Sequence, residues 1–462
     1  MTRYFLPALC GALLLGGCSH TSESPASLPA APSEWRYARD SGETPPDTWW
    51  RGFASSELDA LVEQALNDNQ DLVAAAARLR QAEASARAAG ARAAGAALLP
   101  RLDGNLGASR EGRLGGNGEN AGNRYGGGLV ARYEVDLWGR LAADRDAARA
   151  ELAASRFDRE ALRLSLTASL VDTWLRQAAL AERLHLAELN LNNAERVLAT
   201  VQARQAAGAA TQLELAQQRG LVTEQRRNRE ALRQQADDMR SSLAVLLGQS
   251  EPATVSSASL GALQAPSFIS GLPSDLLLRR PDLARAEAQL RAADADLRAA
   301  RAALLPRLDL SVGTSGTAGS LSRVLADPLY SLAAALTAPI FDGGALAAAR
   351  ERSTARREEL LASYRQRIIE AFADVQVALN AGTGVEAQWQ AQQAVQAQAE
   401  RAFQLAERRY QAGADDLLNL LDAQRILYEA QDRSVQLRLA RLQSRVALAR
   451  ALGGGWRQAD AR

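Results

Sequence analysis

The chain has 462 residues, of which 47% are hydrophobic but only 5% aromatic, so its apolar content is mostly Ala and Leu. Together with Arg, Glu and Gln these residues are strong helix formers, which predicts long helices packed closely through small side chains. The formal net charge is +1, which argues against a nucleic-acid partner held by a basic surface. The sequence contains no Lys, which excludes a P-loop and a Schiff-base lysine.

Residues that carry enzymatic chemistry are scarce. His20 follows the N-terminal leader and His185 stands alone in a helical stretch, so we interpret both as solvated or helix-surface side chains. Of the two cysteines, Cys10 falls inside the leader, which leaves Cys18 as one thiol with no intramolecular disulfide. With no His-centred triad, Lys base or metal-ligand cluster, we expect neither an enzyme nor a cofactor or metal site.

The N-terminus is typical of a secretory signal peptide. Residues 1–17 combine a cationic start, a short apolar run and a small-residue end, and they are too short to span a bilayer as a mature helix. The run Leu15-Gly16-Gly17-Cys18 resembles the lipobox of bacterial lipoproteins, in which the Cys is acylated. The next residue is Ser19 and not the Asp that retains lipoproteins in the inner membrane, which predicts the outer membrane as the destination. The acyl chains would hold the protein on the membrane with about 0.8 kcal/mol of binding free energy per buried CH₂. The alternative is a plain signal peptide with an incidental Cys. Residues 18–56 begin with a Ser-, Pro- and Ala-rich stretch, and we expect a tether there.

The rest of the chain is an internal duplication. The seven residues Ala97–Asp103 recur letter for letter as Ala303–Asp309, and later anchors recur in the same order. We therefore divide the chain into repeat 1 (57–250), an equatorial linker (251–274), repeat 2 (275–456) and a C-terminal tail (457–462).

Each repeat is predicted to form a helix, two strands, a very long helix, a tight reversal and a further helix. The sequence has neither Gly nor Pro from Arg140 to Ala207, enough for a helix roughly 100 Å long. Gly208 and Gly413 stand at the reversals, as expected of helix C-terminal glycines. We expect the second long helix to continue through Gly382 and Gly384, at a cost of about 1 kcal/mol for each Gly.

Strand-like alternation predicts strands at 98–109, 124–138, 304–315 and 329–342. Tyr133 and Val135 point one way and Arg132 and Glu134 the other, a pattern that suits a membrane β-barrel, although a soluble sandwich also shows it. The fourth strand alternates weakly, and its facing stays open. Four strands are too few to close a barrel in lipid, so identical copies must pool them. Three copies give twelve strands, but two or four also close a ring on this argument.

Several motifs occur in one order along the mature chain, and together they resemble the TolC outer-membrane factor family, in particular its lipidated drug-efflux branch. These motifs are Trp49-Trp50 with Phe53, Leu278-Arg279-Arg280-Pro281-Asp282, Phe341-Asp342-Gly343-Gly344, Leu420-Leu421-Asp422-Ala423-Gln424-Arg425 and Leu452-Gly453-Gly454-Gly455-Trp456.

The resemblance implies a homotrimer with a twelve-stranded β-barrel in the outer membrane and an α-helical barrel in the periplasm. It implies a passive exit duct for drugs or other toxic small molecules, docked to a periplasmic adaptor and an inner-membrane pump of the resistance–nodulation–division type. Two alternatives stay open: an outer-membrane duct for protein secretion, and a coiled-coil envelope scaffold without a pore. The scaffold does not explain four amphipathic strands at matching points of the two repeats.

The family resemblance also implies a constricted periplasmic end where the helix hairpins turn. Ala414, Leu418 and Asp422 are spaced to share one helical face, so repeated copies form an apolar ring and an acidic ring that favours cations. The alternative is that Leu418 packs in the helix and Asp422 pairs with Arg425. Asp415 and Asp416 either join this gate or cap the helix that follows. Both hairpin tips, Gly208-Ala209 and Gly413-Ala414, are candidates for adaptor contact.

Overall fold

The computed structural model describes residues 28–38, 44–95, 101–112, 122–256 and 259–457. Met1–Ala31 form a unit of their own, of which only residues 28–31 are described. Everything below concerns the second unit, Pro32–Arg462. The predicted signal peptide and Cys18 lie outside the described residues.

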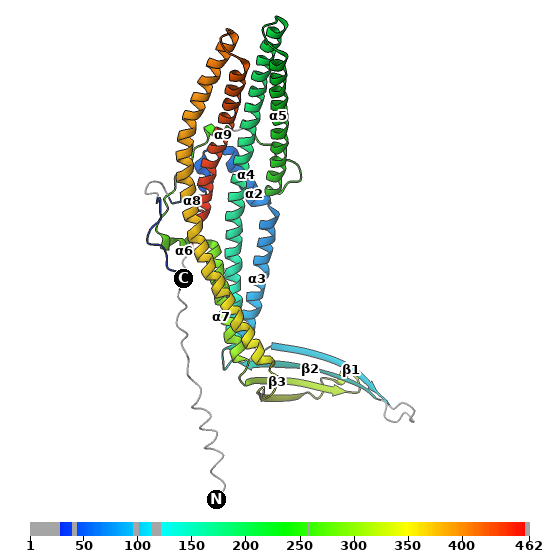
Figure 1. Ribbon diagram of the computed structural model, residues 1–462. Coiled ribbons are helices and arrows are strands. Elements are labelled where there is room, and N and C mark those ends of the chain that lie inside the picture. The colour runs from blue at the N-terminus through cyan, green and yellow to red at the C-terminus, as the bar shows by residue number, and fades with distance from the viewer. Residues whose placement is uncertain (1–27, 39–43, 96–100, 113–121, 257–258, 458–462) are drawn as a thin grey trace. The chain divides into compact units, whose positions relative to one another are not determined.

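The two repeats fold into the same long helices. Helices α4 (Arg140–Ala206) and α8 (Ala345–Gln411) each have 67 residues, and the helices that return beside them, α5 (Gln212–Leu246) and α9 (Leu417–Ala451), each have 35. Each pair forms an antiparallel hairpin (Figure 1). All four helix bounds of the second repeat lie 205 positions after those of the first (345 − 140). Helix α8 passes through Gly382 and Gly384 without interruption, as predicted.

Shorter elements complete each repeat and surround the long helices. Helix α4 contacts α3, α5, α7 and α9, and α8 contacts α7 and α9. The remaining helices are η1 (Trp49–Phe53), α2 (Ser56–Asp68), α3 (Gln70–Gly95), η2 (Leu260–Ala262), η3 (Pro273–Asp275), α6 (Leu276–Arg279), α7 (Pro281–Ala302) and η4 (Leu321–Arg323).

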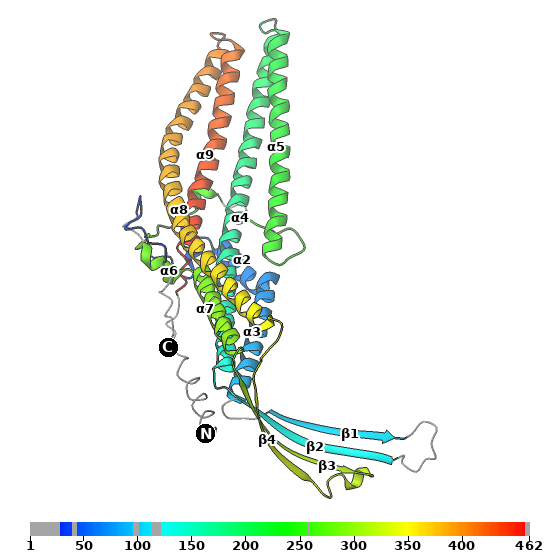
Figure 2. The ribbon, with the colours of Figure 1, turned by 60° about the horizontal axis from the view of Figure 1, so that its bottom comes forward.

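The four strands form one antiparallel sheet in the order β1-β2-β3-β4 (Figure 2). They are β1 (Arg101–Glu111), β2 (Gly122–Val135), β3 (Arg307–Ala318) and β4 (Leu329–Thr337). The register places most of the charged and small polar side chains on one face, here called the polar face, and most of the Leu, Val and Tyr side chains on the other, the apolar face. Val130 and Leu329 on the polar face and Arg110 on the apolar face are exceptions. Within this sheet, β1 and β4 each pair along one edge only.

The register also shows which residues of β4 lie on each face of the sheet, which the sequence analysis left open. Tyr330 lies opposite Thr314, and Leu332 lies opposite Val312. Val312 in turn lies opposite Ala131, which alternates with the charged side chains of β2. Tyr330 and Leu332 therefore belong to the apolar face, and they are exposed there in the single chain.

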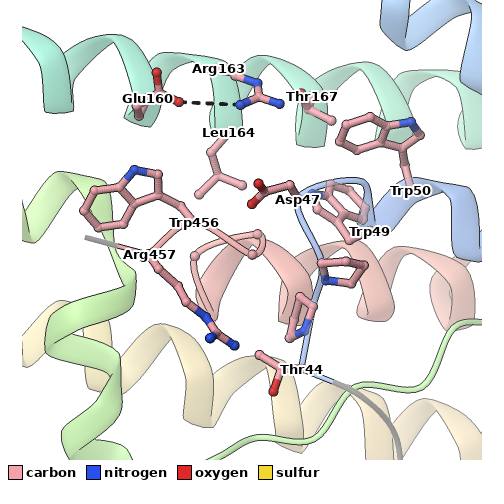
Figure 3. Close-up of a pocket in the computed structure, with 15 residues that line it drawn as sticks. Thr44, Asp47, Trp49, Trp50, Glu160, Arg163, Leu164, Thr167, Trp456 and Arg457 are labelled. Carbon is pink, nitrogen blue, oxygen red and sulfur yellow. Dashed lines mark ion pairs between the residues drawn. The ribbon is translucent and has the colours of Figure 1, made fainter. Parts of the chain in front are cut away.

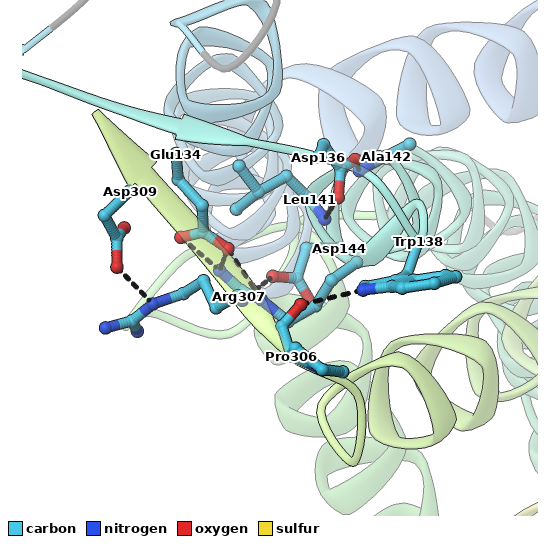
Figure 4. A network of polar contacts seen from close by, with 10 residues as sticks. Glu134, Asp136, Trp138, Leu141, Ala142, Asp144, Pro306, Arg307 and Asp309 are labelled. Atoms are coloured by element: carbon cyan, nitrogen blue, oxygen red, sulfur yellow. Dashed lines mark hydrogen bonds and ion pairs between the residues drawn. The ribbon is translucent and has the colours of Figure 1, made fainter. Parts of the chain in front are cut away.

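All four strands have bounds that differ from the prediction. Strands 124–138 and 329–342 were predicted to end too late, since β2 spans 122–135 and β4 spans 329–337. The alternation of β2 runs on through Asp136, but Asp136 and Asp342 cap the long helices that follow. Asp136 accepts hydrogen bonds from the backbone N–H groups of Leu141 and Ala142 at 3.1 and 2.9 Å (Figure 4), and Asp342 caps α8 in the same way. The strand predicted at 304–315 is shifted to 307–318, since a turn follows α7 before Pro306. Of the strand predicted at 98–109, residues 98–100 lie outside the described residues and β1 continues to Glu111.

The later part of the predicted tether, within residues 18–56, is not an extended spacer. Trp35, Trp49 and Phe53 are buried in the main hydrophobic core, where they join Trp174 and Leu58. Large aromatic side chains gain too much from leaving water to stay in an extended linker. This segment therefore fastens the N-terminal part of the described chain to the middle of α4.

Three consecutive glycines after α9 allow four segments to meet. Gly453, Gly454 and Gly455 have φ values of +88°, +58° and +84°, a region that L side chains rarely adopt. A Cβ atom at Gly453 would overlap the carbonyl of Arg279, and one at Gly455 would overlap the backbone of Pro46. Beside these glycines lies a cavity of about 630 Å³, lined by Trp49, Trp456 and the Glu160–Arg163 ion pair among others (Figure 3).

A substitution pair tests this junction. We expect Gly453→Ala to lower the free energy of unfolding by about 2 kcal/mol, because it adds left-handed strain and a backbone overlap. Gly384→Ala, inside α8 with no atom near the added Cβ, should instead raise it by about 0.5–1 kcal/mol. Chemical denaturation of the purified proteins in detergent, followed by circular dichroism, measures both. Equal effects of the two substitutions would contradict the close approach at Gly453.

Helices α4 and α9 join the two hairpins through buried polar contacts. The Tyr428 hydroxyl donates to the carbonyl of Asn190 at 3.1 Å and accepts from the Gln424 amide at 3.4 Å. Nearby, Arg183 pairs with Asp432 at 2.6 Å. Burial raises the pKa of Tyr428 to about 12, because the charged phenolate is disfavoured away from water.

The raised pKa of Tyr428 makes the stability of the fold depend on pH in the alkaline range. Its folded value lies above the ordinary value of about 10, so this contribution is intact below pH 10 and is lost as pH rises towards 12. Tyr428→Phe should lose about 1 kcal/mol at neutral pH, because the Gln424 amide loses its acceptor and the Asn190 carbonyl keeps only its partner within α4, and it should flatten the alkaline decline. Thermal unfolding between pH 8 and 11 tests this, with exposed Tyr330→Phe as the control. An unchanged alkaline decline in Tyr428→Phe would contradict it.

Candidate functional site

The two hairpins reverse through the same turn. Gly208 and Gly413 have φ values of +73° and +71°. After each glycine, an alanine N–H closes the helix end: Ala209 donates to the Arg204 carbonyl at 2.8 Å and Ala414 to the Arg409 carbonyl at 2.9 Å. This is the Schellman arrangement, in which a left-handed glycine lets the last carbonyls of a helix find donors. The four predicted tip residues therefore form the two turns.

The helices that return from the two turns begin with different caps. Thr211 and Glu214 form a capping box at the start of α5, with the Thr211 hydroxyl accepting from the Glu214 N–H at 3.1 Å. At the start of α9 the cap is Asp416, whose carboxylate accepts from the Asn419 N–H at 3.1 Å. The second hairpin thus carries acidic groups at its end that the first does not have in this position.

The carboxylate of Asp415 is held inside its own turn. It accepts from the Asn419 amide at 2.7 Å and from the Arg409 guanidinium at 3.1 Å. The Asn419 amide, with the Asp416 N–H and Arg409, holds the pKa of Asp415 below its usual value. Asp415 and Asp416 therefore both organise the helix start, which is the capping alternative of the sequence prediction.

Leu418 and Asp422 point to solvent from one face of α9 in the single chain. Leu418 is 63% exposed, and the Asp422 carboxylate pairs with Arg425 at 2.8 Å while its side chain stays 55% exposed. Ala414 was wrongly placed on this helical face. It belongs to the turn, because α9 begins only at Leu417, after the Asp416 cap.

Side chains near the tips also connect the two hairpins. The Arg204 guanidinium from α4 lies over the Tyr410 ring of α8, 4.5 Å from its centroid, and donates to the Tyr410 carbonyl. Further from the tips, Arg196 of α4 pairs with Glu407 of α8 at 3.1 Å. The sequence prediction missed these contacts. The two residues do not occupy corresponding positions of the repeats, since Arg204 stands four residues before Gly208 and Tyr410 three before Gly413, so no local pattern predicted the contact.

Charged side chains gather on the polar face of the sheet near its helical end. The Asp103 carboxylate bridges Arg101 at 2.9 Å and Arg132 at 3.0 Å, and Arg307 pairs with Asp309 at 2.8 Å. The alternation in the sequence predicted that these residues share a face, but not which carboxylate meets which arginine.

The sheet passes into the long helices through a second polar network (Figure 4). Arg140, the first residue of α4, donates to both oxygens of Glu134 at 2.8 and 2.9 Å and to Asp144 at 3.2 Å. The indole N–H of Trp138 donates to the Pro306 carbonyl at 2.8 Å, which ties β2 to the start of β3. These bonds fix the angle at which strand becomes helix.

In the part of the chain that the structure describes, no helix is long and apolar enough to cross a lipid bilayer. The same residues contain no group of three or more His, Cys, Asp and Glu side chains arranged to hold a metal ion.

Comparison with known proteins identifies the family to which this architecture belongs. A family model described as outer membrane efflux protein matches residues 61–249 and 272–454, one stretch in each repeat. Two proteins described as pyoverdine export outer membrane protein OpmQ are each 47% identical: that of Pseudomonas putida over 97% of this chain and 96% of its own, and that of Pseudomonas aeruginosa over 99% and 98%. The solved outer-membrane channel OprN superposes with a TM-score of 0.85 at 29% identity, covering 94% of this chain and 98% of its own. The resemblance to TolC-like channels is thereby confirmed, and the chain belongs to the outer membrane efflux protein family, whose members are passive channels and not enzymes.

Proposed function

We propose that three copies of this chain form the outer-membrane exit duct of a tripartite efflux system, joined to a periplasmic adaptor and an inner-membrane pump. The observation that carries this proposal is the sheet: one face is apolar and exposed, the other is charged, and its two outer strands each have an open edge. In lipid every backbone polar group needs a partner, so β4 of one copy pairs with β1 of the next until the ring closes.

The substrate is proposed from the relatives. Two proteins that align over nearly the whole chain are named for pyoverdine export. A secreted small molecule of that kind is therefore the first substrate to test, ahead of drugs, and protein secretion is the less supported alternative. The scaffold alternative leaves the exposed apolar face of the sheet without a purpose.

Three further assignments belong to this proposal. Cys18 carries the lipid anchor. The turns Gly208-Ala209 and Gly413-Ala414 meet the adaptor, since they are the ends of the two hairpins. Leu418 and Asp422 line the narrow periplasmic end, while Asp415 and Asp416 shape the turn that presents them.

Neighbouring residues on opposite faces of β4 test the assembly. Leu332 is 72% exposed on the apolar face, whereas Ser331 lies on the polar face. Leu332→Arg should destabilise the membrane-embedded ring by about 2–4 kcal/mol, while Ser331→Arg should be tolerated. Light scattering in detergent should give three chains per particle for the unchanged protein and for Ser331→Arg, but not for Leu332→Arg. A particle of one chain in the unchanged protein would refute the duct.

The acidic ring is tested by ion selectivity. Asp422→Asn should reduce the preference of the pore for cations in planar bilayers, and Arg425→Gln should increase it by freeing the same carboxylate. The reversal potential across a potassium chloride gradient measures both changes. If neither substitution moves this potential, Asp422 is only the helix partner of Arg425.

A further inference from the structure

Two arginines face each other directly on the polar face of the sheet. Arg101 of β1 and Arg132 of β2 are register partners in the antiparallel pair. Like charges in directly opposed positions destabilise a sheet, so this arrangement needs compensation. One carboxylate supplies it: Asp103 reaches Arg101 at 2.9 Å and Arg132 at 3.0 Å. Two guanidinium groups thus share a single negative charge, which leaves a local charge of +1.

The neighbouring carboxylates of the described residues are engaged elsewhere. Glu134, two residues along β2, binds Arg140 through both oxygens at 2.8 and 2.9 Å. Asp309, opposite Glu134 in β3, pairs with Arg307 at 2.8 Å. The excess positive charge therefore stays with the arginine pair, Arg101 and Arg132.

The arginine pair is also accessible. The side chains of Arg101 and Arg132 are 80% and 63% exposed, whereas that of Asp103 is 33% exposed. Each guanidinium has five N–H donors in a planar fork, and the bonds to Asp103 use only part of them. The donors that are left match the geometry of a carboxylate, which a guanidinium binds through two parallel hydrogen bonds.

We propose that the arginine pair is an anion-binding subsite in the barrel wall, which receives a carboxylate group of the exported solute as it leaves the helical tunnel. This inference rests on the proposed function, since it places the polar face inside the barrel. Threefold repetition makes a ring of three such subsites, and low-dielectric walls around a narrow opening strengthen its field. The substrate class is therefore a small solute bearing one or more carboxylates.

The competing explanation is that Asp103 and the arginine pair only join β1 to β2. The two explanations differ in what happens when the bridging carboxylate loses its charge. A purely structural bridge weakens in Asp103→Asn and gains no affinity for anions. A subsite gains a net positive charge and binds anions more tightly.

Calorimetric titration of citrate into the full-length purified protein, in detergent at low ionic strength, distinguishes them. The unchanged protein should bind citrate saturably, and added salt should weaken binding. Arg101→Gln combined with Arg132→Gln should weaken it about tenfold or more, as expected for lost charge-assisted hydrogen bonds. Arg124→Gln is the matched control, because Arg124 lies on the same face of β2 but about 26 Å further along the strand.

Weaker binding in the double variant, unchanged binding in Arg124→Gln and tighter binding in Asp103→Asn support the subsite. Absent citrate binding, or equal losses in the double variant and Arg124→Gln, overturns it. If the double variant does not assemble, Asp103→Asn decides alone: tighter binding supports the subsite and unchanged binding overturns it. Planar bilayers separate the two proposals. A conducting trimer that binds no citrate refutes only the subsite, whereas citrate binding with the expected variant pattern in a protein that forms no pore refutes only the duct.

Discussion

The open edges of a small sheet are the constraint on which this molecule depends. Four antiparallel strands leave the outer backbone groups of β1 and β4 without partners, and an apolar face leaves Leu and Tyr side chains in contact with solvent. Water can bond the backbone groups of the open edges but disfavours the exposed apolar side chains. Lipid accepts the apolar side chains but offers no partner to the backbone groups. Only a closed ring of copies in a membrane satisfies both, so the fold of one chain is completed by its neighbours.

The duplication makes that ring possible with little sequence information. Helices of equal length in both repeats, 67 and 35 residues, bring the two turns to corresponding heights, because each residue of a helix adds the same rise. The same glycine turn ends both long helices, at Gly208 and Gly413. The repeats differ in the side chains at their tips, where Asp416 caps α9 in the position that Thr211 occupies at the start of α5. The repeats are therefore alike as scaffolds and different as surfaces.

Local signals in the sequence predicted most of the fold. The absence of Gly and Pro after Arg140 indicated a long helix, and alternation indicated each strand. The errors arose where a residue serves two patterns: Asp136 continues the alternation of β2, yet its carboxylate caps α4. The later part of the tether was misjudged because the Pro and Ser residues of the predicted segment outnumber its aromatic side chains, of which Trp35 and Trp49 are buried in the core.

The candidate site was less predictable, because its contacts join distant positions. The Arg204 guanidinium of α4 donates to a carbonyl 206 residues away, at Tyr410 of α8, and a contact between such distant positions leaves no local signal in the sequence. The tips themselves were predictable, since a glycine ending a helix is a local signal. The sequence did not predict which tip side chains bond to one another, for example that Asp415 binds Arg409 and Asn419.

Arginine, which is the basic side chain used throughout this sequence, is well suited to joining distant segments. Arg280, at the start of α7, is largely buried and binds Asp282 at 2.8 Å and Asp374 of α8 at 2.9 Å. Burial alone would raise the pKa of Asp282, but hydrogen bonding and charge attraction from Arg280 outweigh it, and the pKa falls below its usual value. The group therefore stays ionised at neutral pH, and one planar guanidinium fixes two elements at once. A Lys ammonium, without a planar fork, holds two carboxylates with less directional control. Where one carboxylate serves two guanidinium groups, as at Asp103, the same chemistry leaves an uncompensated positive charge, and the proposed duct exposes that charge to the exported solute.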